Sequence, residues 1–191
     1  MKNHFGSDKL NTIKRKEVEI LFNWVLEPFD SNNPNISFIS GNAGLGKSVI
    51  VSQLYEKLLK ENIPVVCLKA DRLAFDTITD LENEINLTVK FNEFFEQLLE
   101  TEDRGVLLID QIDALSQTLS SNLKPLNVYD RIIRKIIQLN PKVKIVISCR
   151  IYDLNYDPII SSYKGKRNVV ISPLFPEIVK EVLEKSIGDK D

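Results

Sequence analysis

The segment 41-GNAGLGKS-48 combines residue types and a spacing that could bind a phosphate chain. Three of the chain's 7 glycines lie in it, and Lys47 and Ser48 follow the last of them. Glycine accepts positive φ values and carries no side chain, so the backbone N–H groups of such a loop can wrap around phosphate oxygens. We expect Lys47 to reach the β- and γ-phosphates of a nucleotide and Ser48 to offer its hydroxyl to Mg²⁺. The alternative is a glycine turn followed by an incidental Gly-Lys-Ser.

The elements on either side of this segment favour the phosphate-binding interpretation. A short apolar strand is expected at 36–40 and a helix at 48–62, which is the context that a G-x-x-x-x-G-K-[ST] motif requires. The N–H groups of the loop open this helix, and the positive end of its dipole favours an anion. The residues predicted to contact the nucleotide are Gly41, Asn42, Ala43, Gly44, Leu45, Gly46, Lys47, Ser48 and Val49.

A carboxylate that could complete a magnesium site stands at the end of another apolar strand, expected at 105–110. Mg²⁺ in proteins usually binds one or two carboxylates together with substrate phosphates. Open parallel sheets bind their ligands at the carboxyl ends of the strands, which is where Asp110 is expected. We therefore predict that Asp110 serves the Mg²⁺ ion through water, together with Ser48. The alternative is an ordinary strand-end aspartate that caps a turn.

Hydrolysis of a nucleotide would also require a group that positions and deprotonates water. Many ATPases of this layout have a glutamate directly after the strand-end aspartate, but here that residue is Gln111. A glutamine can orient water by hydrogen bonds but cannot accept its proton near pH 7. Asp113 is a candidate base, and a helix N-cap or turn role for this residue stays open. The sequence therefore predicts slow hydrolysis.

Short apolar strands alternate with helices along the rest of the chain. The further strands are expected at 65–70, 144–150 and 168–174. The further helices are expected at 12–26, 78–86, 92–100, 128–140 and 176–186, and residues 114–127 are expected to form a helical turn and a loop closed by Pro125. This alternation predicts a three-layer α/β/α fold with a mostly parallel five-stranded sheet, an N-terminal helix and a C-terminal helix.

Composition and charge exclude several other classes of protein. The 191 residues have a formal net charge of -2, so a general polyanion binder is not expected, and nucleic acid is not an expected partner of this domain. The N-terminal sequence is too polar for a signal peptide, and no run approaches the roughly 20 apolar residues that span a bilayer. Cys67 and Cys149 lie in apolar runs and are expected to be buried, reduced thiols. These features predict a cytoplasmic protein without a membrane partner.

A phosphate loop, then an acid strand, then a strand with the polar tip Arg150 is the order found in the additional-strand P-loop ATPases. In that group the fourth strand lies between the phosphate-loop strand and the acid strand, which implies the sheet order 5-1-4-3-2. An arginine at its tip would face the γ-phosphate, neutralise part of its charge and distinguish ATP from ADP. The alternative is a surface arginine that caps the strand or pairs with Asp153 or Asp157.

Three segments, GNAGLGKS, LLIDQIDAL and VISCR, together resemble the STAND class of signal-transduction ATPases, close kin of the AAA+ ATPases. The resemblance extends from about residue 12 to 186. Its N-terminal part is similar to the helix that precedes the phosphate loop in that class and often contributes to the nucleotide pocket. An acid that some members have after the second aspartate is here Ala114. The resemblance implies catalytic roles for Lys47, Asp110, Asp113 and Arg150, and metal binding by Ser48 and Asp110.

The resemblance also implies a domain organisation. Residues 12–174 would form the P-loop NTPase core, after a mobile tail at 1–11. Residues 175–191 would form the first helix of a truncated lid or a C-terminal extension. Members of the class carry sensing and effector domains, so self-association or fused domains of this kind are expected only in a longer parent protein.

The expected function is Mg²⁺-dependent ATP binding and slow ATP hydrolysis that operate a molecular switch in a larger signalling or defence protein. ATP is favoured over GTP because the chain has no N-K-x-D segment. The alternative is AAA+ remodelling or loading on DNA or protein, which the missing glutamate and the missing basic pore loop disfavour. A small-molecule kinase is disfavoured because residues 151–167 hold a single arginine. A further alternative is an interaction domain that a bound nucleotide stabilises and that hydrolyses almost no ATP. It would differ from the switch only in its rate of ATP hydrolysis.

Overall fold

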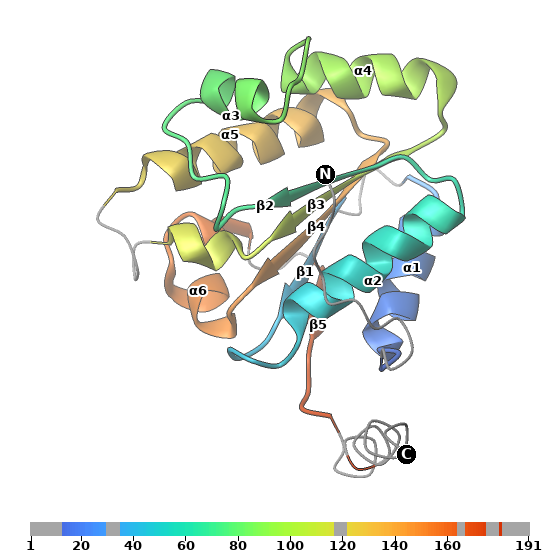
Figure 1. Cartoon of the computed structure of the whole chain (residues 1–191), viewed down its shortest axis with the longest axis vertical. Helices are drawn as coiled ribbons and strands as arrows, with labels where there is room; N and C mark the ends of the chain where they lie inside the picture. The colour runs from blue at the N-terminus through green and yellow to red at the C-terminus, as the bar shows by residue number, and fades with distance from the viewer. Residues whose placement is uncertain (1–12, 30–34, 117–121, 164–166, 175–179, 181–191) are drawn as a thin grey trace, which may run out of the picture.

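A parallel five-stranded sheet forms the centre of the fold in the computed structural model, which describes residues 13–29, 35–116, 122–163, 167–174 and 180 (Figure 1). Adjacent strands follow the order β2-β3-β4-β1-β5, and all four neighbouring pairs are parallel. The predicted order 5-1-4-3-2 is therefore confirmed. The strands are β1 (Ile36–Ser40), β2 (Val65–Lys69), β3 (Gly105–Asp110), β4 (Val143–Cys149) and β5 (Arg167–Val170).

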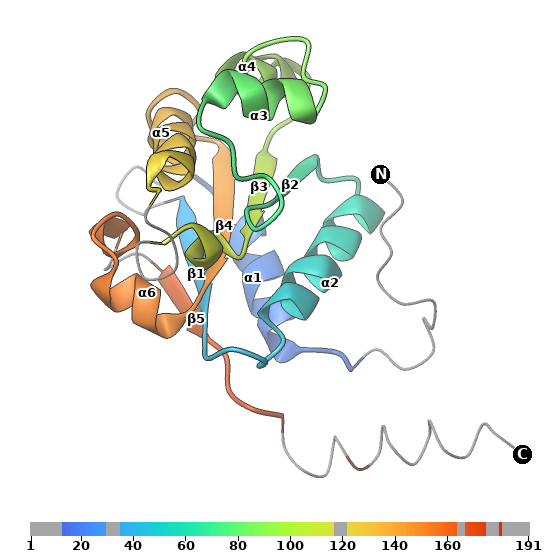
Figure 2. The same ribbon diagram turned by 60° about the vertical axis from the view of Figure 1, so that its left-hand side comes forward.

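Helices cover both faces of the sheet. The strands carry apolar side chains on both sides, so each face of the sheet must be shielded from water by a layer of helices. Figures 1 and 2 show α1 and α2 on one face and α3, α4 and α5 on the other. Along β3, Val106 and Leu108 pack with the α1–α2 side, whereas Leu107 and Ile109 pack with the α5 side. The helical elements are α1 (Lys16–Leu26), α2 (Lys47–Lys60), α3 (Ile78–Glu84), α4 (Phe91–Thr101), η2 (Ile112–Leu115), α5 (Lys124–Leu139), α6 (Ile151–Tyr156) and η3 (Ile160–Tyr163).

Several predicted boundaries differ from the structure. Helix α1 begins at Lys16 instead of residue 12, because the preceding backbone bonds to Gln53. Helix α5 begins at Lys124 instead of residue 128, since Pro125 occupies the first turn of the helix, where its missing N–H is tolerated. Strand β5 ends at Val170 instead of residue 174, because its neighbour β1 ends at Ser40 and Ile171 makes the next hydrogen bond, to Ser40 O.

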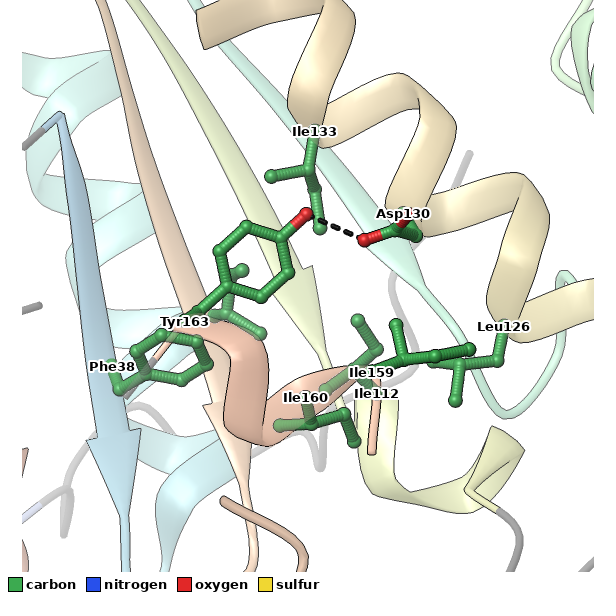
Figure 3. Close-up of a pocket in the computed structure, with 9 residues that line it drawn as sticks. Phe38, Ile112, Leu126, Asp130, Ile133, Ile159, Ile160 and Tyr163 are labelled. Atoms are coloured by element: carbon green, nitrogen blue, oxygen red, sulfur yellow. Dashed lines mark hydrogen bonds between the residues drawn. The ribbon is translucent and has the colours of Figure 1, made fainter. Parts of the chain in front are cut away.

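Two short elements, α6 and η3, were not predicted. Both lie in the stretch between β4 and β5, where the sequence shows no long apolar period. Residues of η3 and α5 line an apolar cavity of about 10 Å³, in which Tyr163 Oη donates to Asp130 Oδ1 over 2.7 Å (Figure 3). A cavity of this size has room for about one water molecule, so it is a gap in the packing and not a ligand site.

The predicted tail at 1–11 and the predicted helix at 176–186 fall outside the described residues, except for Lys180. Both cysteines are free thiols: Cys149 is buried as predicted, but Cys67 is only partly buried. Burial, with a smaller contribution from the Asp110 charge, raises the pKa of the Cys67 thiol to about 11. None of the described helices is long and apolar enough to cross a membrane.

Candidate nucleotide-binding site

The glycine-rich segment forms the turn between β1 and α2, at the carboxyl edge of the sheet. Gly44 and Gly46 have φ angles of 78° and 87°, in the left-handed region that other residues enter at a cost. Gly46 is the N-cap of α2 and has no side chain over the first N–H groups of this helix. These two glycines therefore have the backbone role that the sequence motif predicts.

The ammonium group of Lys47 lies inside this loop. Its Nζ atom donates to Gly41 O over 3.0 Å and to Asn42 O over 3.1 Å, and the residue is only 9% exposed. A largely buried cation beside the N-terminus of a 14-residue helix makes the loop attractive to an anion. All nine predicted contact residues thus lie in one loop and the first turn of one helix; of these, Val49 is 46% exposed.

Ser48 and Asp110 come together from different elements. Ser48 Oγ, in the first turn of α2, donates to Asp110 Oδ1 over 3.2 Å, and Asp110 is 1% exposed at the end of β3. A hydroxyl and a carboxylate are the hard oxygen donors that Mg²⁺ prefers. Among the described residues there is no group of three or more His, Cys, Asp or Glu side chains that could hold a metal ion. The donor set therefore fits Mg²⁺ completed by phosphate oxygens and water, and not an all-protein metal cage.

Ser148, which the sequence analysis did not single out, holds Asp110 and Gln111 in place. Its Oγ atom donates to Asp110 Oδ1 over 2.5 Å and accepts from the Gln111 backbone N over 2.8 Å. The register that pairs Ile109 with Ile147 brings the two following residues, Asp110 and Ser148, side by side. A polar residue two positions before Arg150, directly after the apolar run 145–147, was the available signal.

Gln111 is fixed in an unusual backbone conformation. Its φ angle is 59°, in the left-handed region, and its side-chain Nε2 donates to Ser48 Oγ over 3.1 Å. A glutamine rarely adopts this conformation unless its surroundings stabilise it, and strained residues of this kind are concentrated at functional sites. Here the two hydrogen bonds, to Ser148 and to Ser48, hold the glutamine beside the predicted metal-binding residues.

Arg150 follows β4, the strand next to both the phosphate-loop strand and the acid strand. Its Nε atom donates to Asp113 Oδ2 over 2.8 Å and lies 3.2 Å from Asp153 Oδ2. The predicted alternative partner Asp157 instead accepts from the backbone N atoms of Ile159 and Ile160. The pairing of Arg150 with Asp153 is thus observed. Arg150 also pairs with Asp113, the predicted second acid, and so connects Asp113 to the edge of the sheet that carries the phosphate loop.

Asp113 lies within η2 and is 8% exposed. Burial raises the pKa of its carboxyl group above the usual value, although the hydrogen bond and charge of Arg150 and the charge of Lys47 act in the opposite direction. The residue is not the N-cap of η2, because Gln111 occupies that position. Its side chain is engaged by Arg150. The N-cap role that the sequence left open is wrong, but Asp113 does lie in a turn, because its backbone O accepts from Ser116 N over 3.2 Å.

The chain before α1 is attached next to the phosphate loop. Gln53 of α2 accepts from Arg15 N over 3.3 Å and donates to Ile13 O over 2.7 Å. Arg15 Nη2 donates to Ser172 O over 3.2 Å, which joins this segment to the residues after β5. A β-carbon at Gly41 would lie 3.4 Å from Ile171, so the residues directly after β5 also border the phosphate loop.

Comparison with known proteins identifies the family. The family model for the ATPase family associated with various cellular activities (AAA) matches residues 37–170, which include the phosphate loop, Asp110 and Arg150. The match covers more than half of the chain, so the protein belongs to the AAA ATPase family. ATPases of this family bind and hydrolyse ATP, typically with Mg²⁺. No curated protein sequence matches the chain significantly.

Similar solved structures share the fold. A DNA replication initiation factor has a TM-score of 0.61 and 19% identity, covering 97% of this chain and 53% of that one. AMPPCP-bound DnaA from Aquifex aeolicus has a TM-score of 0.56 and 20% identity, covering 95% and 56%. Drosophila ORC bound to DNA has a TM-score of 0.62 and 15% identity, covering 98% and 49%. The chain thus spans about half the length of these proteins.

Proposed function

We propose that the chain binds ATP with Mg²⁺, hydrolyses it slowly and acts as a nucleotide-operated switch in a larger signalling or defence protein. The observation that carries the proposal is the cluster of Ser48, Asp110 and Gln111, in which the Ser48 hydroxyl bonds both the acid and the glutamine. The first bond joins the two residues proposed to serve Mg²⁺. The second supports slow hydrolysis, because it fixes beside them a glutamine, which cannot accept a proton from water.

Binding of the triphosphate rests on the phosphate loop. The N–H groups around Gly44 and Gly46 and the ammonium of Lys47 would surround the β- and γ-phosphates. Ser48 would bind Mg²⁺ directly and Asp110 through water, with Ser148 fixing the orientation of the Asp110 carboxylate. When bound, Mg²⁺ neutralises charge that develops on the phosphate oxygens.

Hydrolysis is expected to be slow because neither candidate for water activation is well suited to it. Gln111 can orient a water molecule but cannot take its proton near pH 7. Asp113 has a pKa raised by burial, which suits a base, but its Oδ2 atom accepts a hydrogen bond from Arg150. Proton transfer to Asp113 would therefore compete with this ion pair.

Arg150 would couple the γ-phosphate to the rest of the domain. An arginine at the end of a strand next to the phosphate-loop strand can bind the terminal phosphate of ATP, which ADP lacks. We infer a STAND-type module with its P-loop NTPase core at 12–174. Its partners would be ATP, ADP and, in a longer parent protein, further copies or fused sensor and effector domains in the cytoplasm.

The test is binding and steady-state turnover of the purified chain with ATP, ADP and GTP. We expect ATP and ADP to bind, GTP to bind more weakly, and chelation of Mg²⁺ to weaken ATP binding. We expect phosphate release far slower than the typical enzyme rate of about 10 per second. Turnover of many molecules of ATP per second would contradict the switch, and equal binding of ATP and GTP would contradict the assignment of ATP.

A second candidate is AAA+ remodelling or loading on DNA, which the similarity to a DNA replication initiation factor and to DNA-bound Drosophila ORC favours. The chain itself has a net charge of -2, which gives no general attraction to a polyanion. Fluorescence anisotropy of labelled single- and double-stranded DNA with ATP and Mg²⁺ separates the two candidates. We expect no half-saturation up to about 100 µM protein, whereas non-specific DNA binders reach half-saturation between about 1 and 100 µM at physiological salt.

A further inference from the structure

Arg150, the proposed γ-phosphate sensor, also contacts a second carboxylate, which belongs to the buried residue Asp153 on α6. Its Oδ2 atom lies 3.2 Å from Arg150 Nε, and its Oδ1 atom accepts from Ser116 Oγ over 2.6 Å. Ser116 and Asp153 are both buried, with exposed fractions of 0% and 1%. Ser116 directly follows η2, so this contact also connects the segment that carries Asp113 to α6.

Both carboxylates reach Arg150 from the same side of its guanidinium group. The shortest contacts of Asp113 and Asp153 both run to Nε. A guanidinium is planar and rigid, so a group held at Nε fixes the direction of the edge formed by Nη1 and Nη2. That edge makes no hydrogen bond to any residue in the described part of the chain, and it is the edge that binds a phosphate through two parallel N–H groups.

The two carboxylates differ in how firmly they are held. One oxygen of Asp113 is buried and makes no hydrogen bond to the described residues, whereas both oxygens of Asp153 are engaged. A γ-phosphate would compete with these carboxylates for Arg150. The hydrogen bond of Asp113 is to Arg150 itself, whereas Asp153 is also anchored by Ser116, so Asp113 is the carboxylate that a phosphate would displace. Asp153 is therefore the partner that keeps Arg150 in place when Asp113 gives way.

We propose that Asp153, anchored by Ser116, is a positioning residue that directs Arg150 toward the γ-phosphate and so sets the preference for ATP over ADP. This inference rests on the proposed function. In the sequence analysis, pairing with Asp153 was the alternative to a sensor role for Arg150. In this proposal the ion pair with Asp153 instead supports the sensor role. Asp153 itself does not touch the nucleotide.

The test compares the ratio of ADP to ATP dissociation constants, with Mg²⁺, in the wild type and in Arg150→Ala, Asp153→Asn and Asp153→Glu. We expect Arg150→Ala and Asp153→Asn each to reduce the preference for ATP by about tenfold while ADP affinity stays unchanged. Asp153→Glu retains the charge and should recover part of the preference. If Asp153 had only a structural role, its replacement would weaken the binding of ATP and of ADP by the same factor and leave the ratio of the dissociation constants unchanged.

A matched control is Asp157→Asn. Asp157 is also 1% exposed, lies directly after α6 and binds the backbone of Ile159 and Ile160, so its loss should lower stability without changing the ratio. Where Asp153→Asn does not fold, Ser116→Ala tests the same contact, and its ratio should fall in the same direction by a smaller factor.

The outcomes separate the inference from the function on which it rests. If Arg150→Ala lowers the ratio and Asp153→Asn or Ser116→Ala leaves it at the wild-type value, the inference is overturned and the proposed sensor stands. If Arg150→Ala leaves the ratio unchanged, Arg150 senses no γ-phosphate, and both the sensor role and the inference are overturned.

Discussion

Replacement of Lys47 by alanine is expected to weaken ATP binding by at least about a hundredfold, which corresponds to about 2.7 kcal/mol. The reason is the position of the ammonium group, which lies within 3.1 Å of two carbonyl oxygens of the phosphate loop and is largely shielded from water. A charge in such a place interacts with a phosphate far more strongly than one in bulk solvent. Isothermal titration calorimetry with Mg²⁺ and ATP measures the change.

The matched control for Lys47→Ala is Lys60→Ala, which removes the same charge from the exposed last turn of the same helix. We expect Lys60→Ala to bind ATP as tightly as the wild type. This result would show that loss of a positive charge from α2 does not by itself explain the weaker ATP binding of Lys47→Ala. Equal ATP affinity in the wild type and in Lys47→Ala would contradict the assignment of this loop as the nucleotide site.

Replacement of Gln111 by glutamate is expected to raise the rate of ATP hydrolysis by about a hundredfold, at the lower end of what a general base contributes. The side chain already lies 3.1 Å from Ser48 Oγ, and its backbone N is held by Ser148. A glutamate of the same length would therefore place a carboxylate beside the metal-binding hydroxyl, where it can accept a proton from water. Phosphate release at saturating ATP and Mg²⁺ gives the rate.

Two further variants make the Gln111→Glu result specific. Gln138→Glu adds the same charge at an exposed position of α5 and should leave the rate unchanged. Gln111→Ala removes the side chain and should not accelerate hydrolysis. A Gln111→Glu rate no higher than the wild-type rate would mean that this position does not face the attacking water, and Asp113 would remain the candidate base.

The helix and strand types could be predicted from the sequence wherever a long apolar pattern or a strong local signal was present. The strands ending at Ser40 and Asp110 are confirmed with their predicted bounds, because short and mostly apolar runs are typical of strands buried on both faces of a sheet. Where the signal was weak, the prediction failed. The prediction missed the 6-residue helix α6, whose sequence is too short to show an apolar period.

Boundaries were wrong where a tertiary contact decides where an element starts or stops. The hydrogen bonds of Gln53 hold the chain before α1 out of the helix, and the partner residue lies 40 positions along the sequence from Ile13. The early end of β5 follows from the length of β1, against which it pairs. Neither cause can be read from the residues on either side of the boundary.

By itself, the sequence determined the phosphate loop and the strand-end position of Asp110. Both depend on local chemistry: glycines that accept positive φ, and an apolar strand that ends in an acid. Only the tertiary structure decided that Ser148 orients Asp110 from 38 positions away and that Arg150 pairs with Asp113, which lies 37 positions from it along the chain. The physical reason is that hydrogen bonds and ion pairs reach only a few ångströms, so their partners depend on strand register and helix packing and not on spacing along the chain.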